Sequence, residues 1–358
     1  MQLPATSAGP IDLAGVRDRV EEVLTDFLDS KDRTATALGH PLEITETLRE
    51  FLASGGKRIR PLLCVVGWHA AGGHGDMGPV LRAAAALEMF VAWALVHDDL
   101  MDRSDTRRGR PAVHRTLASR HPSLRDADRF GDNAALLIGN FALIWSGELL
   151  HTTQLTPQQR PTVQQFYDTM LSEVMFGQYR DLLGTEHTDY DVDTALAVIR
   201  YKTATGTVQR PLQIGAAIAG ATPTILDTCT DIGLPLGEAF QLRDDLLGVF
   251  GIPQRTGKPN LDDLREGKRT VLLALAVQRA TAAQRDILCS LVANPSLDEH
   301  GASRIRSVME ETGAREAVEK MISDRLTQAL NVLDAAPFPP HATAALRQLA
   351  HSAATRTT

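Results

Sequence analysis

The chain has 358 residues, 43% of them hydrophobic, which is enough to bury a large core as one big domain or two ordinary ones. Asp and Glu outnumber Lys and Arg by 44 to 37, and the formal net charge of −7 disfavours nucleic-acid binding by bulk electrostatics. Apolar runs stay short of the roughly 18 residues that a membrane-spanning helix needs, so we expect no integral membrane segment.

Along the whole chain, apolar residues recur at helical spacing, and strand-like alternation is rare. Gly and Pro breakers separate the periodic stretches. The pattern predicts an all-α fold, a single large helical bundle, with one domain over 11–353 between flexible ends at 1–10 and 354–358. The helices that we expect cover, in chain order, about 12–30, 43–53, 60–71, 79–103, 129–151, 160–184, 191–203, 207–220, 223–250, 268–278, 282–293, 298–311, 313–334 and 341–353.

The three cysteines, Cys64, Cys229 and Cys289, are widely spaced and form no CxxC pair. Neither a disulfide framework nor a zinc knuckle is indicated, and a reducing cytoplasm suits such thiols best. The first residues, MQLPATSAGPIDLAG, lack the basic and apolar regions of a signal peptide. We therefore expect a cytoplasmic protein.

The segment 97–114, HDDLMDRSDTRRGRPAVH, carries the clearest chemistry. Asp98 and Asp102 are one helical turn apart, so they share a face with Cβ atoms about 5–6 Å apart. Mg²⁺ is usually held by one or two such carboxylates together with substrate phosphate. Arg107 and Arg108 follow, and guanidinium groups suit phosphate oxygens. A solvated helix end with salt bridges is the simpler interpretation, but the apolar run FVAWALV before the acids argues against it.

A second acid pair lies in 237–251, GEAFQLRDDLLGVFG. Gln241 precedes Asp244 by three residues and Asp245 by four, so the three side chains share a helix face. An apolar helix again delivers acids to its C-terminal part, where the helix dipole disfavours negative charge. A metal ion would offset this. Two such pairs on separate apolar helices are hard to explain as packing, and together they predict a Mg²⁺-dependent diphosphate site.

Two Gly-containing segments supply cations. The turn GGKRIRP, 55–61, brings three basic residues to a Pro that can open a helix, which would suit a phosphate cradle. The segment GKPNLDDLREGKRT, 257–270, presents Lys258 and Lys268 directly after the second acid pair. Taken alone, each segment reads as an ordinary solvated turn or loop.

The motifs GGKRIRP, DDLMDRSDTRRGRP, GQYRDL, YKTA, FQLRDDLLG and GKPNLDDLREGKRT follow one another over nearly the whole chain. In this order and spacing the chain resembles the trans-isoprenyl diphosphate synthases, the polyprenyl synthetase family. The resemblance implies an all-α bundle around a deep central cavity and a homodimer. It also implies a Mg²⁺-dependent reaction, with Mn²⁺ as a substitute metal, that joins an allylic diphosphate to isopentenyl diphosphate.

The resemblance further implies roles for individual residues. The metal ligands would be Asp98, Asp102 and Asp244. The allylic diphosphate would be gripped by Arg107, Lys202 and Lys258, with Lys268 nearby. Isopentenyl diphosphate would be bound by Lys57, Arg60 and Arg108. The forming carbocation would be faced by Lys202, Thr203, Gln241, Gln178 and Asp181.

Two positions depart from the family pattern. Gly248 stands where many relatives have a third Asp in the second acid motif. Val91 stands where relatives often have a His or Gln that helps to bind isopentenyl diphosphate, and the stripe from Glu88 through Val91 to Asp98 turns Val91 towards the expected cavity. An unpaired buried donor there would weaken binding by about 1–3 kcal/mol.

Bulk four or five residues before the first Asp limits product length in relatives, and here those residues are Ala94 and Trp93. We therefore expect a short-chain product of fifteen to twenty carbons. Three alternatives stay open: a terpene synthase on the same scaffold, a non-catalytic subunit of a heteromeric synthase, and a Mg²⁺- or phosphate-binding protein without turnover.

Overall fold

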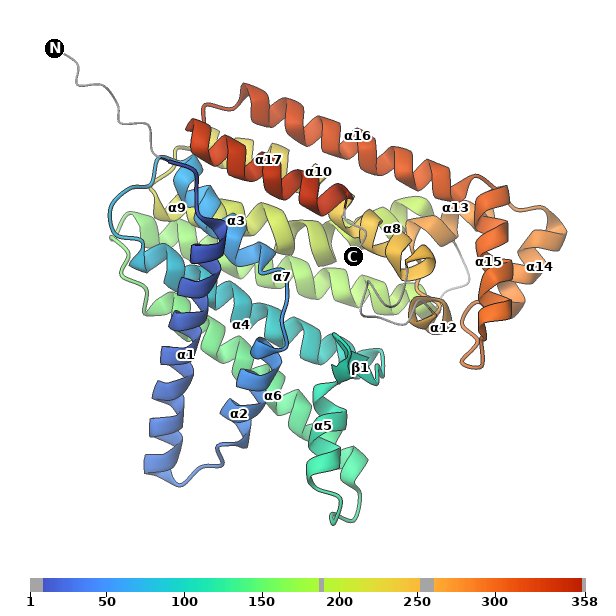
Figure 1. Ribbon diagram of the computed structural model, residues 1–358, viewed down its shortest axis with the longest axis horizontal. Coiled ribbons are helices and arrows are strands. Elements are labelled where there is room, and N and C mark those ends of the chain that lie inside the picture. Colours follow the sequence, from blue (N-terminus) through green and yellow to red (C-terminus); the bar gives the residue numbers. More distant parts are fainter. Residues whose placement is uncertain (1–8, 187–189, 252–260, 356–358) are drawn as a thin grey trace.

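The computed structural model describes residues 9–186, 190–251 and 261–355 of the chain, and helices make up nearly all of it (Figure 1). The first part contains α1 (Leu13–Leu38), α2 (Glu43–Ala53), α3 (Ile59–Ala70), α4 (Gly78–Met101), the two-residue strands β1 (Thr106–Arg107) and β2 (Arg110–Pro111), α5 (Val113–Arg120), α6 (Ala127–His151) and α7 (Gln159–Glu186). The second part contains α8 (Val192–Val198), the π-helix η1 (Ile199–Gln209), α9 (Arg210–Ile218), α10 (Pro223–Phe250), α12 (Asp262–Glu266), α13 (Val271–Arg279), α14 (Ala282–Leu291), α15 (Glu299–Glu311), α16 (Ala314–Ala335) and α17 (Pro340–Thr355).

The predicted all-α class is confirmed, and most predicted helices agree with observed ones within a few residues. Three expectations are wrong. Helix α1 continues past residue 30, because the chain reaches a left-handed stop only at Gly39. Helices α5 and α12 are absent from the expected helices, because both are short and polar. The break expected at 204–206 does not occur, since η1 runs through it into α9 without interruption.

Helix α4 lies at the centre of the bundle and packs mainly against α6, with α3 and α1 on its other sides. A second layer forms where α10 packs against η1 and α16, and α16 and α17 lie along one edge of the molecule in Figure 1. By length and composition alone α4 and α6 could span a membrane, but 78% of the apolar window of α4 is buried inside the bundle. The corresponding fraction for α6 is 44%, which leaves one of its faces uncovered.

Helices α3 and α9 cross at unusually close range, because each presents a glycine to the other. A Cβ at Gly215 would overlap the carbonyl oxygen of Cys64, and a Cβ at Gly67 would overlap that of Leu212. This crossing fixes α3, and with it the basic turn just before α3, relative to the end of η1.

We predict that Gly215→Ala lowers the free energy of unfolding by about 1–3 kcal/mol, because overpacking a close contact forces backbone shifts. The measurement is a denaturant titration followed by circular dichroism. Gly147→Ala in α6 is the matched control, since a Cβ there meets no atom within 4 Å and Ala favours the helix. Equal stability of both variants would show that the α3–α9 crossing can relax.

Candidate active site

Three carboxylates lie where α4 ends. Asp98 and Asp99 belong to the last turn, and Asp102 is the C-cap residue, whose N–H donates to the Asp98 carbonyl oxygen at 2.9 Å. Their side chains are 15%, 1% and 14% exposed, respectively. A buried apolar helix therefore carries several negative charges into the interior, where each needs a cationic partner.

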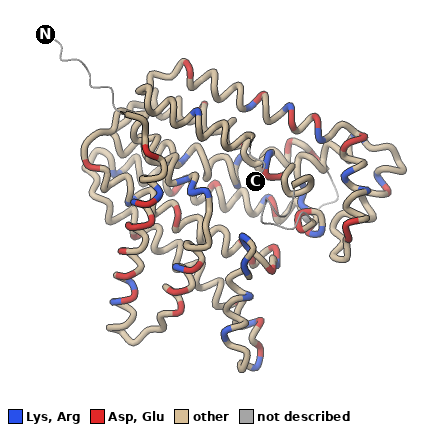
Figure 2. Tube along the Cα trace, viewed as in Figure 1, with Lys and Arg blue, Asp and Glu red and all other residues tan. Residues whose placement is uncertain are grey.

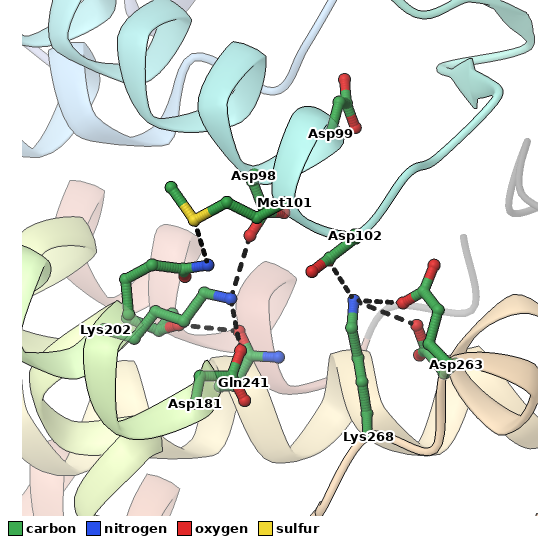
Figure 3. A network of polar contacts seen from close by, with 12 residues as sticks. Asp98, Asp99, Met101, Asp102, Asp181, Lys202, Gln241, Asp263 and Lys268 are labelled. Carbon is green, nitrogen blue, oxygen red and sulfur yellow. Dashed lines mark hydrogen bonds and ion pairs between the residues drawn. The ribbon is translucent and has the colours of Figure 1, made fainter. Parts of the chain in front are cut away.

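Two lysines from distant segments provide such partners (Figure 3). Lys202 Nζ in η1 lies 3.0 Å from Asp98 Oδ1 and 2.6 Å from Asp181 Oδ2 of α7. Lys268 Nζ, just before α13, lies 3.2 Å from Asp102 Oδ2. The structure thus brings together five of the residues that the sequence singled out, from four separate segments.

Lys268 has two further acidic neighbours, which sequence reasoning missed. Its Nζ lies 3.0 Å from Glu266 Oε2 and 3.6 Å from Asp263 Oδ1. A Cβ at Gly248 would overlap the Asp263 carboxylate. Where many relatives have a third Asp on the helix, this chain therefore has a carboxylate from α12. The sequence showed these acids only as part of a charged segment, which is usually solvated.

The π-helix places its residues beside α10. Thr203 Oγ1 donates to Gln241 Oε1 at 3.0 Å, and Gln241 Nε2 donates to Asp245 Oδ1 at 2.8 Å. A π-helix is wider than an α-helix, and π-turns are frequent at functional sites. Asp245 is buried whereas Asp244, the predicted metal ligand, is half-buried. Gln241 is thus fixed at both ends of its amide.

The hairpin of β1 and β2, which follows α4, directs the adjacent residues Arg107 and Arg108 to different parts of the site. Its central residues Arg108 and Gly109 have φ of 55° and 73°, as a tight two-residue turn requires. On one side, Arg107 Nε donates to Asp99 Oδ1 at 2.8 Å. On the other, Arg108 lies over the Phe51 ring, with its guanidinium carbon 5.6 Å from the ring centroid.

Arg108 reaches the basic turn before α3. One of its terminal nitrogens donates to the Gly55 carbonyl oxygen and lies 3.3 Å from Ser54 Oγ. Arg60, on the first turn of α3, donates to the Gly206 carbonyl oxygen at 3.1 Å and to Thr207 Oγ1 at 2.7 Å, both in η1. The structure therefore unites two basic segments that are distant in the sequence. We call Lys57, Arg60 and Arg108 the arginine cradle.

Two predicted residues, Lys57 of the arginine cradle and Gln178, lie at the edges of these groups. Lys57 is exposed and lines a cavity of about 430 Å³ together with Arg17 and Phe240. Gln178 Nε2 of α7 approaches the Met101 sulfur at 3.5 Å. Lys258 lies outside the described residues. Acidic and basic residues are interspersed over the rest of the bundle (Figure 2), so the cationic groups are local features.

Burial and neighbouring charges shift several pKa values in opposite directions. Burial alone would raise the pKa of Asp98, but Lys202, Lys268 and Arg107 lower it to about 2. Burial raises the pKa of Asp245 to about 7, and nearby carboxylates add to this rise. One carboxylate of the site is therefore held ionised, while the other gains its proton only as the pH falls through about 7.

Known proteins of one family are similar to this chain in sequence and in fold. The family model described as Polyprenyl synthetase matches residues 41–310. A geranylfarnesyl diphosphate synthase from Aeropyrum pernix is 29% identical over 322 residues, which is 89% of this chain and 92% of that protein. A (2E,6E)-farnesyl diphosphate synthase from Mycobacterium bovis is 30% identical over 83% of this chain and 78% of its own length.

Among solved structures, a geranylgeranyl pyrophosphate synthase from Corynebacterium glutamicum, complexed with isoprenyl diphosphate and magnesium, is 40% identical. The alignment covers 97% of this chain and 100% of that one, with a TM-score of 0.93. A geranylgeranyl pyrophosphate synthetase from Pyrococcus horikoshii, 24% identical with a TM-score of 0.82, shares the fold.

We predict that Asp245→Asn stabilises the metal-free protein at pH 8 relative to the wild type, by at least about 1 kcal/mol, since one pKa unit corresponds to about 1.4 kcal/mol. The pKa of Asp245 is raised to about 7 in the folded protein. The wild type therefore loses stability as the pH rises from the pKa of this carboxyl in the unfolded chain towards 7. Thermal unfolding at pH 5 and pH 8 with a chelator measures the difference. Asp105→Asn, at an exposed carboxylate, is the control. A difference that does not grow with pH would contradict the pKa assignment.

Proposed function

Because the chain belongs to the polyprenyl synthetase family, we propose that it is a prenyltransferase that condenses an allylic diphosphate with isopentenyl diphosphate. Its product is a short-chain all-trans prenyl diphosphate, farnesyl or geranylgeranyl diphosphate. The observation that carries this function is the presence of two separate cationic groups. One lies beside the α4 carboxylates and the other is the arginine cradle, and a reaction between two diphosphates needs two such binding sites.

The proposed metal is Mg²⁺, with Mn²⁺ as a substitute, held by Asp98 and Asp102 on one side of the allylic diphosphate and by Asp244 on the other. In the described part of the chain, no three His, Cys, Asp or Glu side chains are grouped for a metal ion. Mg²⁺ is usually held by one or two carboxylates plus substrate phosphate, so a pair of carboxylates one turn apart suits it. When bound, the metal supplies positive charge for the leaving diphosphate oxygens.

In the reaction, the allylic C–O bond breaks and its electron pair goes to the departing diphosphate. Lys202, Lys268 and Arg107 lie at the α4 carboxylates and stabilise the charge on those oxygens. The resulting carbocation lies beside Thr203 and Gln241, whose mutual hydrogen bond orients them. The double bond of isopentenyl diphosphate attacks the carbocation, and the proton that the new unit releases passes to the diphosphate.

The alternatives have less support. A terpene synthase needs only one diphosphate site, and the arginine cradle would then serve no purpose. Val91 gives that alternative its best support, and it is 6% exposed on the buried face of α4. A non-catalytic subunit, or a binding protein without turnover, does not require the intact acid pairs at 98–102 and 244–245.

Trp93 supports the short product. It is buried, and its ring centroid lies 5.4 Å from that of Phe90 and 5.9 Å from that of His97, along one side of α4. The His97 ring in turn fills the space beside Gly139 of α6. We propose that this aromatic row limits the growing chain, and that the product has fifteen to twenty carbons.

The proposed partner is a second copy of the chain. Large apolar side chains are exposed on α6 and α7, and the exposed fractions reach 63% at Ile144, 58% at Leu137 and 68% at Phe176. Exposed apolar patches of this kind mark interaction surfaces, and most soluble oligomers are symmetric homodimers. A cytoplasmic location is proposed as well, and three free cysteines suit it.

The function is tested by incubating the purified protein with Mg²⁺ and allylic diphosphates of increasing length, with and without isopentenyl diphosphate. A longer linear diphosphate formed only with isopentenyl diphosphate is the expected product. Hydrocarbon formed without isopentenyl diphosphate would favour the terpene synthase. The absence of any product would favour the non-catalytic subunit.

In the same assay, Asp98→Ala and Asp244→Ala should each lower kcat by orders of magnitude while circular dichroism shows an intact fold. Asp105→Ala in the following segment, at a carboxylate that is 75% exposed, is the matched control and should retain activity. Near-normal rates for either acid-pair variant would refute the metal assignment.

We predict that the double variant Leu137→Glu/Ile144→Glu is monomeric whereas the wild type is a dimer, as measured by sedimentation equilibrium. Both residues lie on the exposed face of α6, where a buried charge would oppose association. Leu38→Glu at the end of α1, at an equally exposed leucine, is the control and should leave the dimer intact. If the wild type is a monomer, the proposed dimer is wrong. If the double variant is still a dimer, the interface does not involve this face of α6.

A further inference from the structure

Arg58 behaves differently from the cations on either side of it. Lys57 is exposed and Arg60 is half-buried, but the Arg58 side chain is only 5% exposed and points into the bundle. Its backbone is left-handed, with φ of 49°, which costs a non-glycine residue about 1 kcal/mol or more. Such strained residues persist only where the surroundings enforce them, and they cluster at functional sites.

The Arg58 guanidinium ties three helices to the start of a fourth. Nε donates to Glu21 Oε1 of α1 at 2.8 Å, and a terminal nitrogen donates to the Leu52 carbonyl oxygen of α2 at 2.7 Å. The other terminal nitrogen donates to Glu88 Oε1 of α4. Arg58 itself is the N-cap residue of α3. The terminal nitrogen that reaches Leu52 also donates to Glu21 Oε1. These four donor–acceptor contacts occupy most of the five N–H groups of Arg58, so this side chain is not available to a diphosphate.

We call Arg58 and its partner Glu88 the clamp. Glu88 is its buried carboxylate, at 4% exposure. It lies on the same helix as Asp98, so α4 carries both the clamp and the proposed metal ligands. Its negative charge also acts on the cradle. Burial lowers the pKa of Arg60 and of Arg108, and the Glu88 carboxylate offsets part of that effect at both.

The clamp holds the turn that forms the arginine cradle. Arg58 follows Lys57 directly and lies two residues before Arg60. The Gly55 carbonyl oxygen, which accepts from Arg108, belongs to the same turn. A shift of the turn would therefore move all three cradle cations relative to one another, and even a misplacement of about 1 Å can cost a hundredfold in rate.

We propose that Arg58 and Glu88 are positioning residues for the second diphosphate subsite, which hold the cradle in its binding geometry without touching the substrate. This proposal rests on the proposed function, because it takes the occupant of the cradle to be isopentenyl diphosphate. It predicts that loss of the clamp weakens isopentenyl diphosphate and leaves the allylic site nearly unchanged.

The test compares Glu88→Gln, Arg58→Lys and the double variant. We expect each single variant to raise the KM for isopentenyl diphosphate about tenfold, with kcat and the KM for the allylic substrate within about twofold of wild type. The double variant should be no worse than the singles, because residues that act through one contact are not additive. Titration calorimetry with isopentenyl diphosphate alone gives a second readout, independent of turnover.

Glu238→Gln is the matched control. Glu238 is another buried carboxylate between two arginines, with Arg325 Nε at 2.7 Å and an Arg200 terminal nitrogen at 3.0 Å, but it lies on α10 and does not contact the basic turn. This variant should lose stability without a selective change in the KM for isopentenyl diphosphate. If Glu88→Gln does not fold, Glu21→Gln replaces it, since Glu21 is 45% exposed, with an expected rise of about twofold to threefold.

The outcomes separate the possibilities. Unchanged isopentenyl diphosphate affinity in both Glu88→Gln and Arg58→Lys would overturn the proposal, and so would an equal rise in both KM values. Weaker binding in Arg58→Lys together with normal or tighter binding in Glu88→Gln would make Arg58 a direct ligand and would also overturn it. If the wild type itself neither binds isopentenyl diphosphate nor uses it, the proposed function fails, and that result is visible before any variant is compared.

Discussion

The charge balance of α4 governs the arrangement of the site. This helix is apolar and buried, yet it carries Glu88, Asp98, Asp99 and, at its end, Asp102. An unpaired charge in such a place would cost several kcal/mol. Each carboxylate accordingly meets a cation from a different segment. Glu88 meets Arg58, Asp98 meets Lys202, Asp99 meets Arg107 and Asp102 meets Lys268. The requirement to neutralise one helix thus gathers Lys202, Arg107 and Lys268, the proposed diphosphate ligands, and Arg58, which holds the neighbouring turn.

Lys202 and Lys268 each contact more than one carboxylate, which leaves their ammonium groups able to bind phosphate as well. The Lys202 ammonium lies between Asp98 and Asp181, and the Lys268 ammonium lies among Asp102, Asp263 and Glu266. A lysine that divides its contacts among several carboxylates is held in place without depending on any one of them. It can re-pair with phosphate oxygens at little cost in position, because the remaining carboxylates still anchor it.

The sequence predicted the helices and the main acidic and basic groups, because apolar periodicity and charged motifs are local patterns. It could not predict features that depend on contacts between distant segments. The run KRIR does not reveal that Arg58 is the most deeply buried of its cations, since that depends on Glu21 and Glu88. In the sequence, Asp263 belongs to a charged segment that is typical of a solvated loop. Its position beside Gly248 depends on the path of the chain between them, which local patterns do not show. The π-helix η1 has no local signature, so the sequence predicts a break at 204–206, inside it.

The hairpin after α4 sets how the two proposed diphosphate sites are spaced. Arg107 is the last residue of β1, whereas Arg108 and Gly109 form the left-handed turn that follows, and the two arginine side chains therefore reach different partners. Arg107 therefore belongs to the carboxylates of α4, whereas Arg108 belongs to the turn at Gly55. Since one peptide unit joins the two arginines, neither site can shift far without the other. The same helix, through Glu88 and Arg58, fixes that turn from the opposite end. In the proposed reaction, α4 and this hairpin together determine the distance between the two substrates, as a reaction between two bound molecules requires.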